Sequence, residues 1–319
     1  MPGPTPDLTP DFAPSAAPAG AGQPGRGRRG RLLIVGCGDV GLRVLRLLAG
    51  RWTVLALTSS AARAPELRAA GAIPLIGDLD DARSLGRLAG LADRVLHLAP
   101  PAATGRTDER TRHLLQALSR SAPPRRLVYA STSGVYGDCG GARIDETRAP
   151  RPANDRAWRR VDAEAQLRQW GRVSGCAVTV LRVPGIYAFN REGGHPRERL
   201  AKGLPVLARE DDVYTNHIQA DDLARACLLA LMRGPAPRVL HASDDSELRM
   251  GDYFDLAADL CVLPRPGRVA RAQAAERFSP MQMSFMNESR RMDNGRLKRE
   301  LRLKLRYPTP REGLLAVED

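Results

Sequence analysis

Short apolar runs alternate with helical stretches along the first half of this chain. The runs are mostly Leu, Ile, Val and Ala, the pattern of buried strands in a parallel sheet. The stretches between them carry apolar residues three and four positions apart, the spacing of one helix face. Such alternation indicates a parallel sheet with right-handed crossovers. The expected strands are residues 32–35, 53–57, 73–76, 94–98 and 127–130, and the expected helices are residues 40–49, 62–70, 80–89 and 107–119.

The second half continues less regularly. Its apolar spacing predicts two more strands and three more helices, followed by a basic C-terminal segment of mixed pattern. Residues 1–30 differ, because they are mostly Pro, Ala, Gly and Thr and show no apolar period; we expect a disordered arm there. The additional strands are expected at residues 177–183 and 238–242, and the helices at 155–173, 221–232 and 250–260.

The charge and the cysteine content of the chain indicate which binding partners and which cellular compartment to expect. The formal net charge of +13 at pH 7 invites a nucleic-acid hypothesis, but the arginines are spread along the chain and aromatic residues make up only 4%. We therefore expect no specific nucleic-acid partner. Five scattered cysteines without a Cys-x-x-Cys pair indicate reduced thiols, a cytoplasmic location and no metal site. No run of about 18 apolar residues occurs, so the sequence predicts no membrane span.

A glycine turn follows the first expected strand. Gly36, Gly38 and Gly41 form Gly-x-Gly-x-x-Gly between a strand and a helix. In this context the first glycine permits a tight turn, the second lets the backbone approach a pyrophosphate, and the third lets the helix pack on the strand. The phosphates would then lie at the helix N-terminus, beside Asp39 and Val40. The turn therefore predicts a bound nicotinamide dinucleotide.

The choice between NAD and NADP depends on residues after the second expected strand. A carboxylate about twenty residues beyond the turn would select NAD by binding the ribose hydroxyls, whereas this chain has Thr58, Ser and Ser there. Arg63 could pair with a 2′-phosphate, so the sequence favours NADP over NAD; the alternative is an ordinary exposed arginine. Asp78 and Leu79, after the third expected strand, are candidates for the adenine end, or Asp78 caps the next helix.

Four segments beyond the glycine turn carry a family resemblance. They are ASTSGVYG at residues 130–137, RVPGIY at 182–187, NHIQADDLA at 216–224 and LRYPTPREGL at 305–314. Together they resemble the extended short-chain dehydrogenase/reductase superfamily, in particular its NAD(P)-dependent epimerase/dehydratase and sugar-nucleotide epimerase-like members.

The resemblance implies an α/β fold with a doubly wound Rossmann sheet and a smaller C-terminal α/β substrate lobe. We expect the NAD(P)-binding domain at residues 31–184, with 213–233 returning to it, and mainly the substrate lobe at 185–319. The resemblance is also compatible with a homodimer.

The resemblance also implies roles for two loops. In the family, a hydroxyl after the fifth strand polarises the substrate oxygen, a role that falls here on Ser131, Thr132 or Ser133, with Ser133 preferred. The alternative is that these hydroxyls only cap the local backbone. The proline-glycine loop of Pro184, Gly185 and Ile186, which ends at Tyr187, is implied to lie by the nicotinamide.

The sequence lacks one motif that the family resemblance leads us to expect. The family's Tyr-x-x-x-Lys pair places both side chains on one helix face, where the cation lowers the phenol pKa. No tyrosine here is followed four residues later by lysine, and Arg156 and Arg160 stand at that spacing instead. Arginine keeps its proton, so it can bind an anion but not act as an acid or base. Arg156, Arg159 and Arg160 either grip a ligand's phosphate or carboxylate, or form a solvated face that pairs with Asp162 and Glu164.

Two functions remain open from the sequence. The preferred one is an atypical NAD(P)-dependent oxidoreductase or epimerase that acts on a small, polar, anionic and nucleotide-sugar-like substrate. Its proton would come from Tyr136, Tyr187 or Asp138, although either tyrosine ring could instead pack against the cofactor or the substrate lobe. The other function is a non-catalytic NAD(P)-binding sensor or regulatory module.

Overall fold

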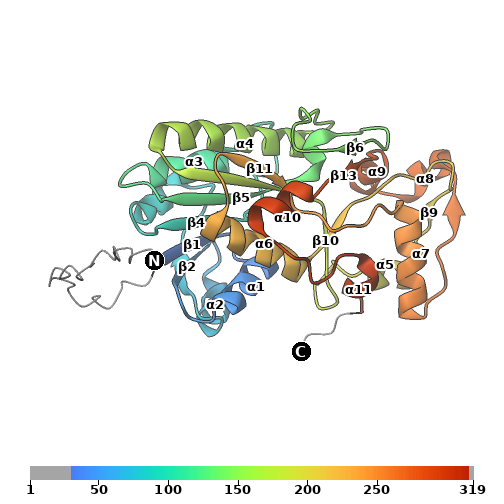
Figure 1. Ribbon diagram of the computed structural model, residues 1–319, viewed down its shortest axis with the longest axis horizontal. Coiled ribbons are helices and arrows are strands. Elements are labelled where there is room, and N and C mark those ends of the chain that lie inside the picture. The colour runs from blue at the N-terminus through green and yellow to red at the C-terminus, as the bar shows by residue number, and fades with distance from the viewer. Residues whose placement is uncertain (1–29, 316–319) are drawn as a thin grey trace, which may run out of the picture.

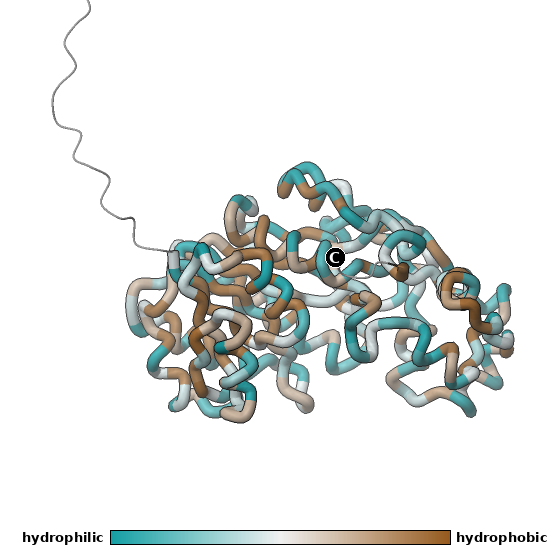
Figure 2. Tube along the Cα trace, turned by 90° about the horizontal axis from the view of Figure 1, so that it is seen from below, coloured by the Kyte–Doolittle hydropathy of each residue, from teal (hydrophilic) through white to brown (hydrophobic). Residues whose placement is uncertain are grey.

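The structure of the chain, a computed structural model, describes residues 30–315. The arm expected at residues 1–30 lies outside the described residues, apart from Gly30. In Figure 2 hydrophobic segments run through the interior of the sheet-bearing body, and hydrophilic segments lie along its outer loops. This arrangement agrees with the apolar runs from which the strands were predicted.

Seven parallel strands form the main sheet, in the order β11-β7-β5-β4-β1-β2-β3. The strand order reverses between β1 and β4, and β1 is an inner strand with Ile34 beside both Ala56 and Leu96. The sequence prediction of a doubly wound parallel sheet is confirmed. The strands are β1 (Arg31–Val35), β2 (Thr53–Thr58), β3 (Ile73–Ile76), β4 (Arg94–His97), β5 (Arg126–Thr132), β7 (Ala177–Val183) and β11 (Arg238–His241).

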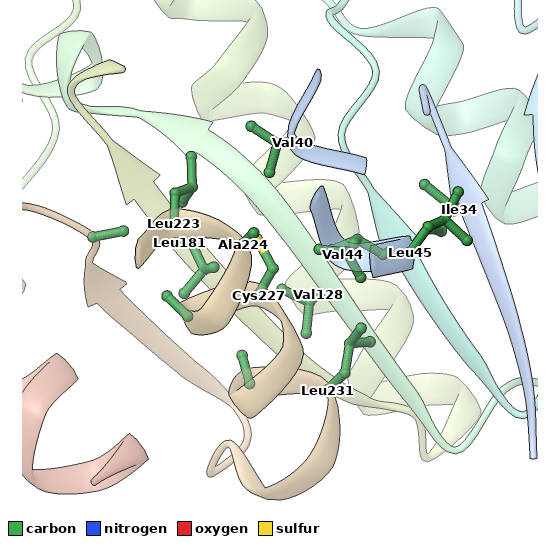
Figure 3. Close-up of a cluster of buried hydrophobic side chains, with 14 of the residues drawn as sticks. Ile34, Val40, Val44, Leu45, Val128, Leu181, Leu223, Ala224, Cys227 and Leu231 are labelled. Atoms are coloured by element: carbon green, nitrogen blue, oxygen red, sulfur yellow. The ribbon is translucent and has the colours of Figure 1, made fainter. Parts of the chain in front are cut away.

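Helices cover both faces of this sheet (Figure 1). One face buries a cluster that includes Ile34, Val44 and Val128, and Figure 3 shows such side chains converging from the strands and from α1 and α6. The other face buries Leu114 and Leu127 under α3 and α4. Burial of this apolar area is the main stabilising contribution to the fold. The helices are α1 (Asp39–Leu48), η1 (Ala61–Arg63), α2 (Ala64–Ala69), α3 (Glu109–Leu118), α4 (Asp155–Ser174), α6 (Ala220–Arg233) and α10 (Gly295–Leu301).

The remaining elements lie mostly beyond one end of the sheet, at the right of Figure 1. Three short parallel pairs, β6 with β13, β8 with β10 and β9 with β12, join segments that are distant in the sequence. The strands are β6 (Arg143–Ile144), β8 (Gly185–Tyr187), β9 (Val206–Leu207), β10 (His217–Gln219), β12 (Arg268–Val269) and β13 (Arg291–Met292). The helices are η3 (Ser133–Tyr136), α5 (Arg197–Ala201), α7 (Met250–Cys261), α8 (Arg271–Arg277), α9 (Pro280–Met286) and α11 (Pro310–Gly313).

Two details differ from the sequence predictions. The α-helix expected at residues 80–89 is a 3₁₀ helix, η2 (Ala82–Leu88), in which Asp81 rather than Asp78 caps the helix by accepting from the Arg83 backbone N–H. Glycine at position 86 and the short connection to β4 favour the tighter helix. The chain also returns to the main sheet through β11, which lies beyond the expected return at residues 213–233.

Candidate functional site

A groove of about 300 Å³ lies at the carboxyl ends of the central strands, where the strand order reverses. Open parallel sheets bind their ligands at this kind of position. The structure brings together here ten of the residues proposed from the sequence: Gly36, Gly38, Asp39, Val40, Gly41, Ser131, Thr132, Arg160, Pro184 and Ile186.

The three glycines of the turn are required for different reasons. Gly36 has a φ of +81°, and a Cβ atom there would lie 2.5 Å from the backbone nitrogen of Ala99. A Cβ on Gly41 would lie 3.0 Å from the Sγ atom of Cys37, so this glycine allows α1 to approach β1. A Cβ on Gly38 would meet nothing within 4 Å. The space beside Gly38 and the uncapped start of α1 therefore fit a dinucleotide pyrophosphate.

The residues proposed for the adenine end do not line this groove. The Thr58 hydroxyl accepts a hydrogen bond from the Ser60 backbone N–H at 3.2 Å. The Arg63 guanidinium donates to both carboxylate oxygens of Glu66, at 3.0 and 3.2 Å. These contacts hold the loop after β2 in place. Arg63, the last residue of η1, is thus paired with a carboxylate of the following helix α2.

Asp78 and Leu79 follow β3 in a tight turn. The Asp78 carboxylate accepts from the Asp80 backbone N–H at 2.9 Å, so the alternative that Asp78 caps the next helix is wrong. Leu79 is buried, and its carbonyl oxygen lies 2.7 Å from Nδ1 of His113.

A second cavity of about 1000 Å³ adjoins the groove. The two share wall residues, so a molecule in the groove would border the larger space. Asn154 at the start of α4, the β8 strand and α9 contribute to the wall, together with the loop that follows β4. The shared residues are Thr132, Arg160, Pro184, Ile186 and Arg191.

Ser133 and Thr132 lie side by side in the larger cavity but have different partners. The Thr132 hydroxyl accepts from the Gly134 backbone N–H at 3.3 Å and caps η3. The Ser133 hydroxyl instead accepts from Nη2 of Arg290 at 3.3 Å. The capping alternative therefore describes Thr132, whereas Ser133 faces a cation that comes from a distant segment.

Arg290 is a site residue that the sequence analysis missed. It is 7% exposed, and its Nη1 donates to the Gly137 carbonyl and to Glu288, both at 2.8 Å. It precedes β13, whose pairing with β6 brings the segment to η3. No local motif marks this arginine, because its position depends on a contact with Ser133 across 157 residues.

Tyr136 lies beneath the cavity, fully buried, and lines neither cavity. Its hydroxyl accepts from Nη1 of Arg182 at 2.6 Å and lies 2.5 Å from Nε2 of His241. Burial raises the pKa of Tyr136 to about 12. Arg182 in turn donates two hydrogen bonds to Glu164, at 3.1 and 2.7 Å, and Ser131 donates a third at 2.7 Å. Tyr136 therefore belongs to a buried network and is not positioned as the proton donor expected from the sequence.

The other two proton-donor candidates are also held away from the cavities. Tyr187 is buried among the side chains around α7 and packs edge-on against the ring of His217, with ring centres 6.2 Å apart. Asp138 accepts from the backbone N–H groups of Ser289 and Gly140, at 2.8 and 3.1 Å. Burial would raise the pKa of Asp138, but these N–H groups outweigh it and hold the pKa below its usual value. Asp138 thus fixes a turn.

Three of the five arginines of α4 line the larger cavity, namely Arg156, Arg159 and Arg160. Arg156 is exposed, and its guanidinium lies 4.8 Å from the ring centre of Phe285. Arg159 is buried and donates to the Gly105 carbonyl at 2.5 Å. Arg160 donates to the Tyr129 hydroxyl at 2.9 Å and to the Ala130 carbonyl at 3.0 Å.

The alternative that these arginines pair with Asp162 and Glu164 is wrong. Asp162 accepts from the Asp108 backbone N–H and from Gln166, and Glu164 from Ser131, Arg168 and Arg182. Both carboxylates are thus occupied by partners other than Arg156, Arg159 and Arg160. The cavity wall is therefore strongly cationic, since the acidic residues among its described members are Glu192 and Glu288. Its arginines are Arg156, Arg159, Arg160, Arg191, Arg199 and Arg290.

His217 is another wall residue that sequence reasoning left without a role. It lies beside Gly185 in the β8–β10 pair and stacks on Tyr253 with ring centres 3.9 Å apart. Burial lowers the pKa of His217 to about 3, so the ring is neutral at physiological pH. Its Nδ1 atom is buried without a hydrogen-bond partner among the described residues.

Two other kinds of site are absent from the part of the chain that the structure describes. No group of three or more His, Cys, Asp or Glu side chains within residues 30–315 is arranged to hold a metal ion. No helix in that range is long and apolar enough to cross a membrane.

Together, the reversed strand order, the glycine turn and the adjoining cavity define a class, the Rossmann proteins of the extended short-chain dehydrogenase/reductase type. The family model described as "NAD dependent epimerase/dehydratase family" matches residues 32–242. The chain therefore belongs to the NAD dependent epimerase/dehydratase family. No curated protein sequence matches the chain.

Solved structures share this fold over nearly the whole chain. A functionally unknown conserved protein from Silicibacter pomeroyi DSS is 30% identical, with a TM-score of 0.74, covering 89% of this chain and 96% of that chain. With the same coverage, the UDP-glucose 4-epimerase of Thermotoga maritima, solved with UDP-glucose, is 19% identical with a TM-score of 0.73. The UDP-glucose 4-epimerase of Thermus thermophilus, solved with NAD, is 22% identical with a TM-score of 0.70, again with this coverage.

Proposed function

We propose that the chain is an NAD(P)-dependent oxidoreductase or epimerase that acts on a small, polar, anionic substrate. The observation that carries this proposal is the continuity of the glycine-turn groove with a larger, arginine-lined cavity that contains Ser133. A nicotinamide dinucleotide would supply hydride exchange when bound. In the relatives' structures the molecules bound are NAD in one and UDP-glucose in another. A nucleotide sugar is therefore one substrate class to test.

The chain's own residues have distinct parts in this function. The glycine turn and the start of α1 would hold the pyrophosphate. The Ser133 hydroxyl would donate to a substrate oxygen, while Arg290 beside it stabilises negative charge on that oxygen. The other arginines of the cavity would hold the anionic group of the substrate. The segment that follows β7 would form most of the substrate side, as the proposed domain division implies.

We also propose a preference for NADP over NAD. The support is the absence of a carboxylate at the end of β2, where Thr58 stands, and the presence of Arg63 nearby. Because Arg63 is paired with Glu66, a 2′-phosphate would have to compete with that carboxylate. The preference is therefore expected to be modest, and Glu66→Gln should strengthen NADPH binding more than NADH binding.

The first experiment is a titration of the purified full chain with NADPH, NADH and their oxidised forms, followed by nicotinamide fluorescence and calorimetry. Saturable binding supports the proposal, and absence of binding of every form overturns it. A panel of nucleotide sugars and other anionic alcohols and ketones then tests hydride exchange, with Ser133→Ala as the matched variant. Unchanged turnover in Ser133→Ala would remove the role proposed for that hydroxyl.

A second function is favoured by one specific observation. The positions expected for Tyr-x-x-x-Lys hold Arg156 and Arg160, and Tyr136 is buried beneath the cavity. A non-catalytic dinucleotide sensor would need no proton donor. Stereospecific hydride transfer to any substrate would exclude this second function.

A further inference from the structure

A set of polar side chains connects the start of α1 to the loop between β8 and α5. The Asp39 carboxylate accepts from Nε of Arg43, at 3.1 and 3.2 Å to its two oxygens, and from Nη1 of Arg191 at 2.5 Å. Arg43 also donates to Asp221 at 2.6 Å and to Asn190 at 2.5 Å. Two guanidinium groups from different elements therefore neutralise one carboxylate at the mouth of the groove.

The Asp39 carboxylate lies where a bound pyrophosphate would meet it as a like charge. It is in the first turn of α1, where the helix dipole and free N–H groups attract an anion, and it lines the groove. A pyrophosphate bound at this helix end would bring two further negative charges close to it. Like charges at short range raise the free energy of binding unless a cation lies between them.

The two arginines differ in their freedom to meet a ligand. Arg43 is only 2% exposed and is fixed within α1 by partners on two other segments. Arg191 is 26% exposed, comes from a loop and lines both the groove and the larger cavity. A small rotation of a long arginine side chain is enough to move its fork from one oxyanion to another. Of these two arginines, Arg191 is thus the one that can reach an incoming phosphate.

We propose that Arg191 is a clamp for the cofactor's pyrophosphate, exchanging the Asp39 carboxylate for phosphate oxygens when a dinucleotide binds. The inference rests on the dinucleotide binding of the proposed function and assigns a residue outside the glycine turn to it. Arg43 remains on Asp39 after the exchange, so the carboxylate does not become an unpaired charge. One charge-assisted contact replaces another, which keeps the cost of the movement low.

The direct test compares ligands with and without a diphosphate on the full-length chain. We expect Arg191→Gln to weaken the binding of NADH and ADP by about 10- to 100-fold, the usual effect of losing a hydrogen bond to a charged group. Adenosine, which lacks phosphate, should bind the variant and the wild type equally. Arg197→Gln is the matched control, because Arg197 is exposed, lies in the same region and lines neither cavity.

A double-mutant cycle with Asp39→Asn separates the clamp from simple neutralisation. If Arg191 contacts the phosphate, Arg191→Gln still weakens NADH binding at least about tenfold in the Asp39→Asn background. If Arg191 only neutralises Asp39, this loss disappears and the clamp is refuted. Arg191→Lys, which keeps the charge without the fork, should fall between the wild type and Arg191→Gln.

The outcomes distinguish the inference from the proposed function. If wild type binds NADH and Arg191→Gln binds it equally well, the clamp is refuted while the dinucleotide site stands. If wild type binds none of the nicotinamide dinucleotides, the proposed function fails and the clamp fails with it. Thermal unfolding of each variant checks that a loss of binding does not come from a loss of folded protein.

Discussion

The groove and the larger cavity share a wall but recognise their ligands in different ways. The groove is made mainly by backbone, with three glycines and a helix start that lie within six consecutive residues. The larger cavity is made by ionised and hydroxyl side chains from segments as far apart as Ser133 and Arg290. The first depends on backbone conformation, and the second depends on buried ion pairs that keep distant segments in place.

The largest expected effect tests whether the cavity depends on its buried network. Glu164 is fully buried and accepts from Arg182, which is itself 3% exposed. Glu164→Leu leaves that guanidinium without its carboxylate, so we expect the free energy of unfolding to fall by about 3–5 kcal/mol. Urea unfolding measures it, with Arg112→Gln as the control, because the exposed Arg112–Glu109 pair should contribute no more than about 1 kcal/mol. Equal losses of unfolding free energy in Glu164→Leu and Arg112→Gln would show that the cavity side does not depend on its buried ion pairs.

The next effect separates two glycines of the groove. Gly36→Ala places a Cβ against the backbone of Ala99 at a φ of +81°, so we expect a loss of about 2–4 kcal/mol in unfolding free energy. Gly38 has a φ of −87° and open space at its Cβ, so Gly38→Ala should change stability by less than about 1 kcal/mol.

For NADH binding we expect the opposite order, with the larger effect at Gly38 rather than at Gly36. The Gly38→Ala methyl group lies where a pyrophosphate approaches the backbone, so we expect NADH to bind about tenfold more weakly. Calorimetric titration of the folded variant measures this. Tight binding by Gly38→Ala would place the pyrophosphate elsewhere.

A smaller effect concerns acid stability on the cavity side. Burial lowers the pKa of His217 to about 3 in the folded chain, whereas an unfolded histidine titrates near 6.5. The unfolded state therefore binds more protons below that pH, and stability is lost as the pH falls from about 6.5 toward 3. Between pH 7 and pH 5 this histidine should account for a loss of about 2 kcal/mol. His217→Gln should lose correspondingly less in urea unfolding at the two pH values; an unchanged loss would show that His217 is already solvated.

The smallest effect tests an exposed arginine of the same wall. Arg156 is exposed and contacts the ring of Phe285 at 4.8 Å. Because exposed cation–π contacts contribute about 0.5–1 kcal/mol, Arg156→Gln should lower the unfolding free energy by no more than that. Arg159→Gln, which alters a buried guanidinium, should cost more in the same measurement. If Arg156→Gln lowered the unfolding free energy more than Arg159→Gln, the exposed fraction of an arginine in this wall would not indicate how much it contributes to stability.

The difference between the two regions also explains what the sequence could predict. Each main strand, like the glycine turn, is determined by a run of consecutive residues. The predicted positions of these elements are confirmed within one or two residues, for example β7 at Ala177–Val183. The helix expected at residues 80–89 was wrong because Leu85 and Leu88, three positions apart, fit the period of a 3₁₀ helix as well as that of an α-helix. The short strands β6, β8, β9, β10, β12 and β13 escaped prediction because two or three residues cannot show a pattern.

The residues of the larger cavity were harder to predict from the sequence for a related reason. Arg290 and Glu164 owe their positions to partners on other elements, and neither belongs to a recognisable motif. Tyr136 stands in a recognisable segment, yet the side chain turns inward because Arg182 and His241 offer its hydroxyl two partners. Local sequence places a residue on an element, but long-range packing decides which way its side chain faces.

The pairing of β6 with β13 affects the order in which the glycine turn and the larger cavity form during synthesis. A growing chain emerges from the ribosome at about 5–20 residues per second, so the 157 residues between Ser133 and Arg290 take about 8–30 s to make. The glycine turn, by contrast, needs only β1 and its neighbours. During synthesis the glycine turn can thus form long before the Ser133 hydroxyl meets its cation.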